Sequence, residues 1–135
     1  MGRKLILDTN MLIDYERGRI NREQFDDDHL AIAAITVAEY RTGIELADTA
    51  ERSAARARHL EAILNIVDVL EYTAHTAAIH AQLIAHTRRT GGSRGAHDLI
   101  IAAHAAETGR TLITRDAQAR FAHLPGVTAS SEQTP

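Results

Sequence analysis

Short apolar runs alternate along this chain with longer segments that have helical periodicity. Because strands joined by helices run parallel and are connected by right-handed crossovers, this alternation strongly restricts the possible folds. We expect an α/β fold, a three-layer α/β/α sandwich around a central, mostly parallel sheet of four to five strands. The strands are predicted at residues 4–7, 30–35, 66–70 and 111–114.

Helical segments fill the intervals between these strands. Thr9 or Asn10 is predicted to cap the first helix, and Thr36 to cap the second, with Glu39 at the spacing of a capping box. A chain of 135 residues fits a single domain, residues 1–135, with a frayed tail from about residue 129. The helices are predicted at about residues 9–17, 36–46, 49–64, 73–88 and 97–107.

Composition excludes several classes of site. The chain has no cysteine, so disulfides, thiolate metal sites and cysteine nucleophiles are excluded. No apolar run approaches the length of a membrane-spanning helix, so a cytoplasmic protein without membrane association is expected. The formal net charge of −3 argues against strong non-specific attraction to nucleic acid, although a local basic rim remains possible.

Four acidic residues occupy related positions in the predicted fold. Asp8 and Asp116 follow predicted strands, while Glu39 and Asp98 lie near the starts of predicted helices. In a parallel sheet all four fall at one edge, which is where open α/β sheets bind ligands. Clustered carboxylates repel one another and need a cation or raised pKa values. Each acid alone has a simpler explanation, such as a helix cap or a favourable charge in a first helical turn.

The motifs around these acids resemble the PIN-domain family, and more closely the VapC toxins of bacterial toxin–antitoxin pairs. The similarity rests on four motifs in order, which are Leu-Asp8-Thr9-Asn10, Thr36-Val-Ala-Glu39, His97-Asp98-Leu-Ile-Ile-Ala-Ala and Leu-Ile-Thr114-Arg115-Asp116.

This resemblance implies a Mg²⁺- or Mn²⁺-dependent endoribonuclease whose catalytic, metal-binding residues are Asp8, Glu39, Asp98 and Asp116. Thr9, Asn10 and Thr114 would orient ligands or waters around the metal. The expected RNA products carry a 5′-phosphate and a 3′-hydroxyl. The expected substrate is transfer or ribosomal RNA, with inhibition of translation and growth. The resemblance also implies a VapB-like antitoxin partner and a homodimer.

Arginines near the expected site are candidate RNA contacts. Arg115 lies between Thr114 and Asp116, and Arg94 and Arg89 lie near the glycine-rich loop before Asp98. Phosphate binding and a structural role both fit these positions. His97, next to Asp98, is a further candidate substrate contact. The acids Asp14, Glu16 and Glu45 are predicted to be surface or peripheral charges.

The same residues also raise four other functions. Phosphotransfer through a phosphorylated Asp8 is disfavoured because such enzymes use a lysine beside the phosphate, whereas the only lysine here, Lys4, precedes Asp8 in the first strand. Zinc is disfavoured because His75, His80 and His86 are five and six residues apart, which does not align them on a helix face, and His97 and His104, which could share a face, have no clear third ligand. An interaction module of PIN type, or an RNA-processing nuclease that is not a toxin, remains open as an alternative.

Overall fold

The central element of the computed structural model is a five-stranded sheet in the order β3-β2-β1-β4-β5, with every neighbouring pair parallel. The structure describes residues 2–115, 121 and 123–131. This sheet confirms the predicted α/β class and its parallel strands. Its strands are β1 (Lys4–Leu7), β2 (His29–Ala33), β3 (Asp68–Leu70), β4 (Thr111–Thr114) and β5 (Thr128–Ser131).

Strand β5 corrects one prediction. A frayed tail was expected from about residue 129, but residues 129–131 belong to β5 and pair with β4. The segment has too little apolar character to be recognised locally as a strand. Its pairing with the edge of β4 supplies the hydrogen bonds that local sequence does not predict. The rest of the expected tail lies outside the described residues.

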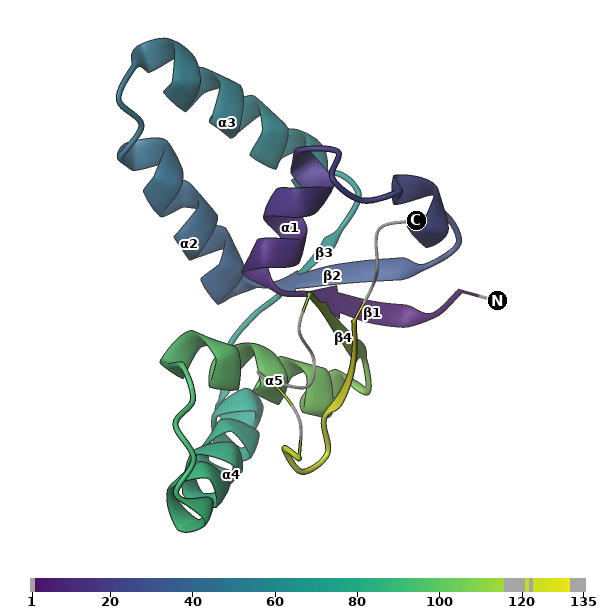
Figure 1. Cartoon of the computed structure of the whole chain (residues 1–135), viewed down its shortest axis with the longest axis vertical. Coiled ribbons are helices and arrows are strands. Elements are labelled where there is room, and N and C mark those ends of the chain that lie inside the picture. Colours follow the sequence, from purple (N-terminus) through teal and green to yellow (C-terminus); the bar gives the residue numbers. More distant parts are fainter. Residues whose placement is uncertain (1, 116–120, 122, 132–135) are drawn as a thin grey trace.

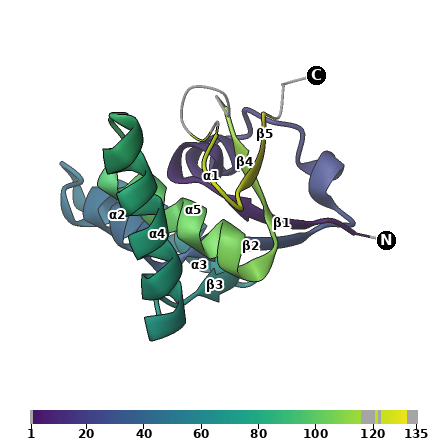
Figure 2. The ribbon, with the colours of Figure 1, turned by 90° about the horizontal axis from the view of Figure 1, so that it is seen from below.

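Helices cover both faces of the sheet (Figure 1). On one side lie α1, α2 and α3, and α2 and α3 form a hairpin that points away from the sheet. On the other side α5 lies between the sheet and α4, as the view from below shows (Figure 2). The bounds are α1 (Thr9–Glu16), the 3₁₀ helix η1 (Arg22–Phe25), α2 (Ala34–Glu45), α3 (Ala50–Leu64), α4 (Ala74–Thr90) and α5 (Ala96–Thr108).

Two apolar cores hold these layers together. Within β1, Leu5 and Leu7 belong to the core under α1 and α3, whereas Ile6 belongs to the core under α4 and α5. Successive side chains of a strand point to opposite faces, so a strand covered on both sides is apolar at every position. This explains why β1 is a continuous apolar run rather than an alternating one. None of the helices in the described part of the chain is both long and apolar enough to cross a membrane.

The strand order creates a crevice beside β1. From β1 the chain moves outward to β2 and β3, and it then returns to place β4 on the other side of β1. The connections from β1 to β3 contain α1, α2 and α3, whereas the connection from β3 to β4 contains α4 and α5 on the other face of the sheet (Figure 1). Ligands of open α/β sheets bind at such switch points, beyond the carboxyl ends of the strands. Asp8 is the first residue after β1 at this position.

Candidate active site

Asp8 is held rigidly at the crevice. It is completely buried and is the N-cap of α1, where its Oδ1 accepts a hydrogen bond of 2.8 Å from the backbone N–H of Met11. Thr9 and Asn10, which the sequence suggested as caps, are instead the first two residues of α1. The positive end of the helix and the N–H donor stabilise a carboxylate at this position.

Glu39, the sixth residue of α2, joins two other elements at the site. Its Oε1 accepts a hydrogen bond of 2.8 Å from the Thr9 hydroxyl, and its Oε2 lies 3.3 Å from Nδ1 of His97. Thr9 follows Asp8, and His97 precedes Asp98. The contacts of Glu39 therefore link the N-termini of α1 and α5, which carry the other two described acids.

The predicted capping box between Thr36 and Glu39 is wrong. Helix α2 begins at Ala34, two residues earlier than Thr36, and its N-cap Ala33 makes no side-chain cap. Thr36 is therefore inside the helix and completely buried. Because Glu39 is not needed by the helix terminus, its carboxylate is free to reach Thr9 and His97.

Asp98 lies in the first turn of α5 and is half-buried. Its carboxylate packs against Gly95, the N-cap of α5, so closely that a Cβ atom built on Gly95 would lie 3.2 Å from Oδ2. No side chain caps this helix, and the carboxylate in its first turn is favoured by the positive helix end. A glycine at the cap leaves the space that the carboxylate occupies.

The remaining predicted residues of the site have different environments. Thr114, at the end of β4, is completely buried, and its hydroxyl has no hydrogen-bond partner among the described residues. Asn10 is exposed on the first turn of α1. Asp116, the fourth predicted acid, lies outside the described residues.

The three candidate RNA-binding arginines also have different environments. Nε of Arg115 donates a hydrogen bond of 2.7 Å to Asp14 of α1, so Arg115 takes part in a structural ion pair. Asp14 was predicted to be a peripheral charge, but it ties the end of β4 to α1. Arg94 is half-buried in the loop before α5, and Arg89 is exposed on the last turn of α4.

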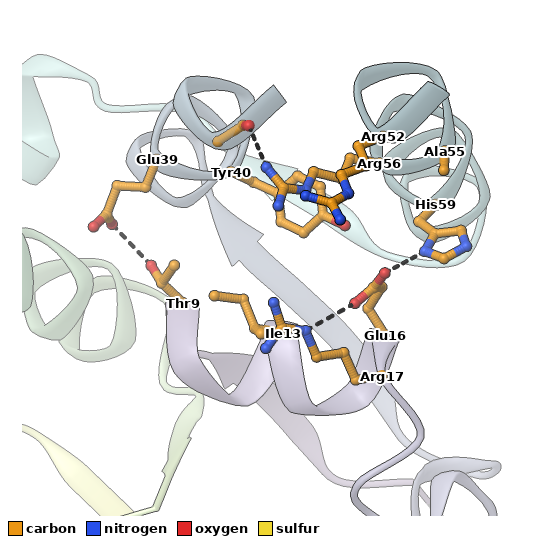
Figure 3. Close-up of a pocket in the computed structure, with 11 residues that line it drawn as sticks. Thr9, Ile13, Glu16, Arg17, Glu39, Tyr40, Arg52, Ala55, Arg56 and His59 are labelled. Carbon is orange, nitrogen blue, oxygen red and sulfur yellow. Dashed lines mark hydrogen bonds and ion pairs between the residues drawn. The ribbon is translucent and has the colours of Figure 1, made fainter. Parts of the chain in front are cut away.

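A pocket of about 420 Å³ lies beside the acids, between α1, α2 and α3 (Figure 3). Thr9 and Glu39 lie at one end, and Glu16 and His59, which contact each other, lie at the other. Burial raises the pKa of Tyr40, and the nearby charge of Glu16 raises it further. The sequence analysis did not find this pocket. Its other lining residues are Ile13, Arg17, Gly43, Arg52, Ala55 and Arg56.

The donor atoms at the acids suit a hard cation. The carboxylate oxygens of Asp8, Glu39 and Asp98 are of the kind that Mg²⁺ and Mn²⁺ prefer as ligands, and such ions retain several waters rather than needing a closed protein cage. In the part of the chain that the structure describes, no group of three or more acidic or histidine side chains is arranged to hold a metal ion by itself. The fit to a hard cation therefore rests on the oxygen chemistry of these acids, and the buried hydroxyl of Thr114 is a further oxygen without a hydrogen-bond partner among the described residues.

Comparison with known proteins places this architecture in a family. The PIN-domain family pattern matches residues 5–127. Ribonuclease VapC5 of Mycobacterium tuberculosis is 34% identical over 121 residues, which cover 90% of this chain and 87% of the relative. The tRNA(fMet)-specific endonuclease VapC of Salmonella typhimurium is 30% identical, with coverage of 92% and 94%.

A solved structure gives the same result. The crystal structure of DNA-bound VapBC from Salmonella typhimurium superimposes with a TM-score of 0.83 at 28% sequence identity, covering 96% of this chain and 98% of that chain. Both the fold and the sequence relatives agree with the resemblance seen in the four acidic motifs. The chain belongs to the PIN-domain family, in its VapC branch.

Proposed function

We propose that this protein is a Mg²⁺- or Mn²⁺-dependent endoribonuclease that acts in the cytoplasm as the toxin of a toxin–antitoxin pair. The observation that carries the proposal is the position of Glu39, whose contacts with Thr9 and His97 join the helix termini that hold Asp8 and Asp98. Related VapC proteins are named ribonucleases or endonucleases, which supports the same chemistry.

Each acid has a distinct part in this proposal. Asp8 is fixed by the N-terminus of α1 and supplies one oriented carboxylate, while Asp98 supplies another from the N-terminus of α5. Glu39 completes the group from α2, and Asp116 is proposed as the fourth member. A bound divalent ion would supply the positive charge that activates water and stabilises the phosphate oxygens. The proposed products have a 5′-phosphate and a 3′-hydroxyl.

The proposed substrate is a structured RNA, either transfer or ribosomal, and the proposed inhibitor is a VapB-like antitoxin. The endonuclease name of the Salmonella relative supports transfer RNA. Structural neighbours described as VapBC complexes support the antitoxin. Inhibition would follow if a basic side chain of the antitoxin entered among the acids. A homodimer remains a prediction, which light scattering of the purified protein tests.

Asp8→Asn tests the catalytic proposal with little risk to the fold. Asparagine is as good an N-cap as aspartate, so the hydrogen bond from the Met11 N–H is retained while the charge is lost. We expect at least a 100-fold loss of Mg²⁺- or Mn²⁺-dependent RNA cleavage, on the order of the effect of removing a direct metal or transition-state contact. The melting temperature should stay near that of the wild type.

The control is Asp27→Asn, which makes the same chemical change at an exposed position before β2. It should leave cleavage unchanged. Mn²⁺ titration calorimetry on each variant separates loss of metal binding from loss of chemistry. Wild-type cleavage by a folded Asp8→Asn protein would contradict the proposal, as would cleavage that persists after chelation of the metal.

A further inference from the structure

The pocket between α1, α2 and α3 adjoins the acids but is chemically different from them. Three arginines, Arg17, Arg52 and Arg56, line it together with the apolar side chain of Ile13. Figure 3 shows these guanidinium groups facing the space between α1 and the α2–α3 hairpin, with Glu39 at its end. In a chain with a net charge of −3, this is a local concentration of positive charge.

Two of the three arginines have acidic neighbours. Arg52 is bonded to Asp48 at 2.8 Å, and Nε of Arg17 lies 3.9 Å from Glu16. Both are exposed, with relative side-chain exposures of 65% and 52%, so solvent also screens their charges. Neither arginine therefore needs a further anion.

Arg56 is different. It is half-buried, and its Nη1 donates a hydrogen bond of 2.7 Å to the carbonyl oxygen of Gly43. That partner is neutral, and no carboxylate of the described residues lies within ion-pair distance of the Arg56 guanidinium. The bond fixes one side of the planar group and leaves its other donors for a ligand. A partly desolvated cation without a counter-charge favours the binding of an anion.

Tyr40 adds a neutral donor at the same place. Its pKa is raised by burial and by Glu16 and is lowered in part by Arg56 and Arg17, so its hydroxyl lies within the electrostatic range of all three groups. The hydroxyl therefore stays protonated at neutral pH and can donate a hydrogen bond. Arg56 and Tyr40 together offer a guanidinium and a hydroxyl to an anion.

We propose that this pocket binds a phosphate group of the RNA strand next to the bond that is cleaved, with Arg56 as its principal ligand. The inference rests on the proposed ribonuclease function. The phosphate under attack lies at the acids, where a cation would neutralise it, whereas flanking phosphates must be neutralised by the protein. Arg56 lines the same pocket as Glu39, and its planar donors match the geometry of phosphate oxygens.

The first experiment compares Arg56→Ala with Arg58→Ala in RNA cleavage. Arg58 lies on the same helix but is exposed and does not line the pocket. We expect Arg56→Ala to raise KM about tenfold and to change kcat less than about threefold, as for loss of one charge-assisted phosphate contact. Arg58→Ala should leave both constants unchanged. Arg56→Lys should recover part of the affinity because it restores the charge but not the planar donors.

The second experiment measures binding without cleavage. In an Asp8→Asn background, anisotropy of a fluorescein-labelled single-stranded RNA spanning the cleaved bond gives the salt dependence of affinity. Arg56→Ala should reduce the slope of log K against log salt by about 0.7, as for one phosphate contact to a single strand. Replacing one flanking phosphate with neutral methylphosphonate should weaken binding to the protein with Arg56 intact, and Arg56→Ala should add no further loss at that position.

Several outcomes would overturn the inference. An unchanged KM and salt slope in Arg56→Ala, with normal wild-type cleavage, would remove the phosphate site and leave the proposed function intact. Loss of binding to an acidic partner peptide with RNA binding unchanged would assign the pocket to protein recognition instead. A wild-type protein that cleaves no RNA would refute the proposed function and this inference together. If Arg56→Ala lowers the melting temperature strongly, Arg56→Gln, which keeps a donor for the Gly43 carbonyl, takes its place.

Discussion

Gly95→Ala should impair RNA cleavage without unfolding the protein. Gly95 has φ −64° and ψ 139°, which alanine adopts without strain, so the backbone does not require glycine here. The constraint comes from Asp98. A Cβ atom at residue 95 would lie 3.2 Å from Oδ2, 3.6 Å from Cγ and 3.9 Å from Cβ of that residue. The added methyl group therefore presses on the carboxylate proposed to act in catalysis.

The size of the effect follows from this geometry. A carbon–oxygen contact of 3.2 Å is tighter than nine in ten real Cβ contacts, so the carboxylate of Asp98 must move by a few tenths of an ångström. A displacement of about 1 Å at a reacting group can cost about 100-fold in rate, so we expect cleavage to fall by roughly 3- to 30-fold. Stability should change by less than about 1 kcal/mol, because the lower entropy of the unfolded alanine chain offsets a poorer N-cap.

The assay measures the rate of metal-dependent RNA cleavage and the urea unfolding curve of the same preparations. Gly92→Ala is the matched control, since it lies in the same loop and an added Cβ would meet only Thr90 Oγ1, at an ordinary 3.8 Å. It should cleave at the wild-type rate. Full activity in Gly95→Ala would refute the placement of Asp98 at the reacting centre. A loss of several kcal/mol in stability would show instead that the glycine serves the fold.

Two further predictions concern stability. Thr9→Val removes the 2.8 Å hydrogen bond to Glu39 and should lower the free energy of unfolding, measured in urea, by about 1 kcal/mol. Thr9→Ser keeps the hydroxyl and should retain most of this stability. Equal stability of the two variants would contradict the prediction. His104 is buried, and burial lowers its pKa below the ordinary 6.5, an effect opposed by Glu107 and reinforced by His80. The unfolded chain therefore takes up the proton first, and stability should fall as the pH drops below about 6.5. His104→Leu should reduce that loss between pH 7 and 5 in thermal unfolding, while the exposed control His75→Gln should not; equal pH dependence in His104→Leu and wild type would contradict the assignment.

Local sequence predicted the fold well where a strand is buried on both faces, because such a strand is a continuous apolar run. Strand β1 is apolar at every buried position because both sides of the sheet are covered. Strand β5 was missed because Thr128 to Ser131 are small and partly exposed, and their pairing with β4 is a contact between segments. Such tertiary pairing overrides weak local preference.

The candidate site was predicted from the same logic, with one instructive error. The structure places Asp8 at the end of β1 as predicted, and Glu39 contacts Thr9 and His97 beside Asp8 and Asp98. The catalytic role of these acids stays a prediction. The role of Glu39 was misassigned to a capping box with Thr36, since that pattern is common at helix starts. The helix starts at Ala34, directly after Ala33, the last residue of β2 that pairs with β3. This pairing involves a distant segment, so the sequence around residue 34 alone does not predict the helix start.

The pocket between α1, α2 and α3 could not be predicted from the sequence because its residues are brought together by packing between helices. Arg17 is the C-cap of α1, Tyr40 lies in α2 and Arg56 lies in α3. The distances between them along the sequence follow no pattern that predicts a shared pocket. Arg56 looks like one of several solvated arginines on a helix rich in alanine and arginine. In the structure, Arg56 differs from its neighbour Arg58 because it is half-buried, lines the pocket and donates a hydrogen bond to the Gly43 carbonyl across the α2–α3 hairpin.

Glu39 connects the chemistry of the acids with the pocket that adjoins them. It lines the pocket, and its two oxygens also contact Thr9 and His97, which belong to the helices carrying Asp8 and Asp98. A ligand that fills the pocket therefore meets the same carboxylate that holds the acids together. If the pocket binds RNA as proposed, RNA binding and the positions of the acids are coupled through the Glu39 side chain. A partner that occupied the pocket would then compete with the RNA without contacting Asp8.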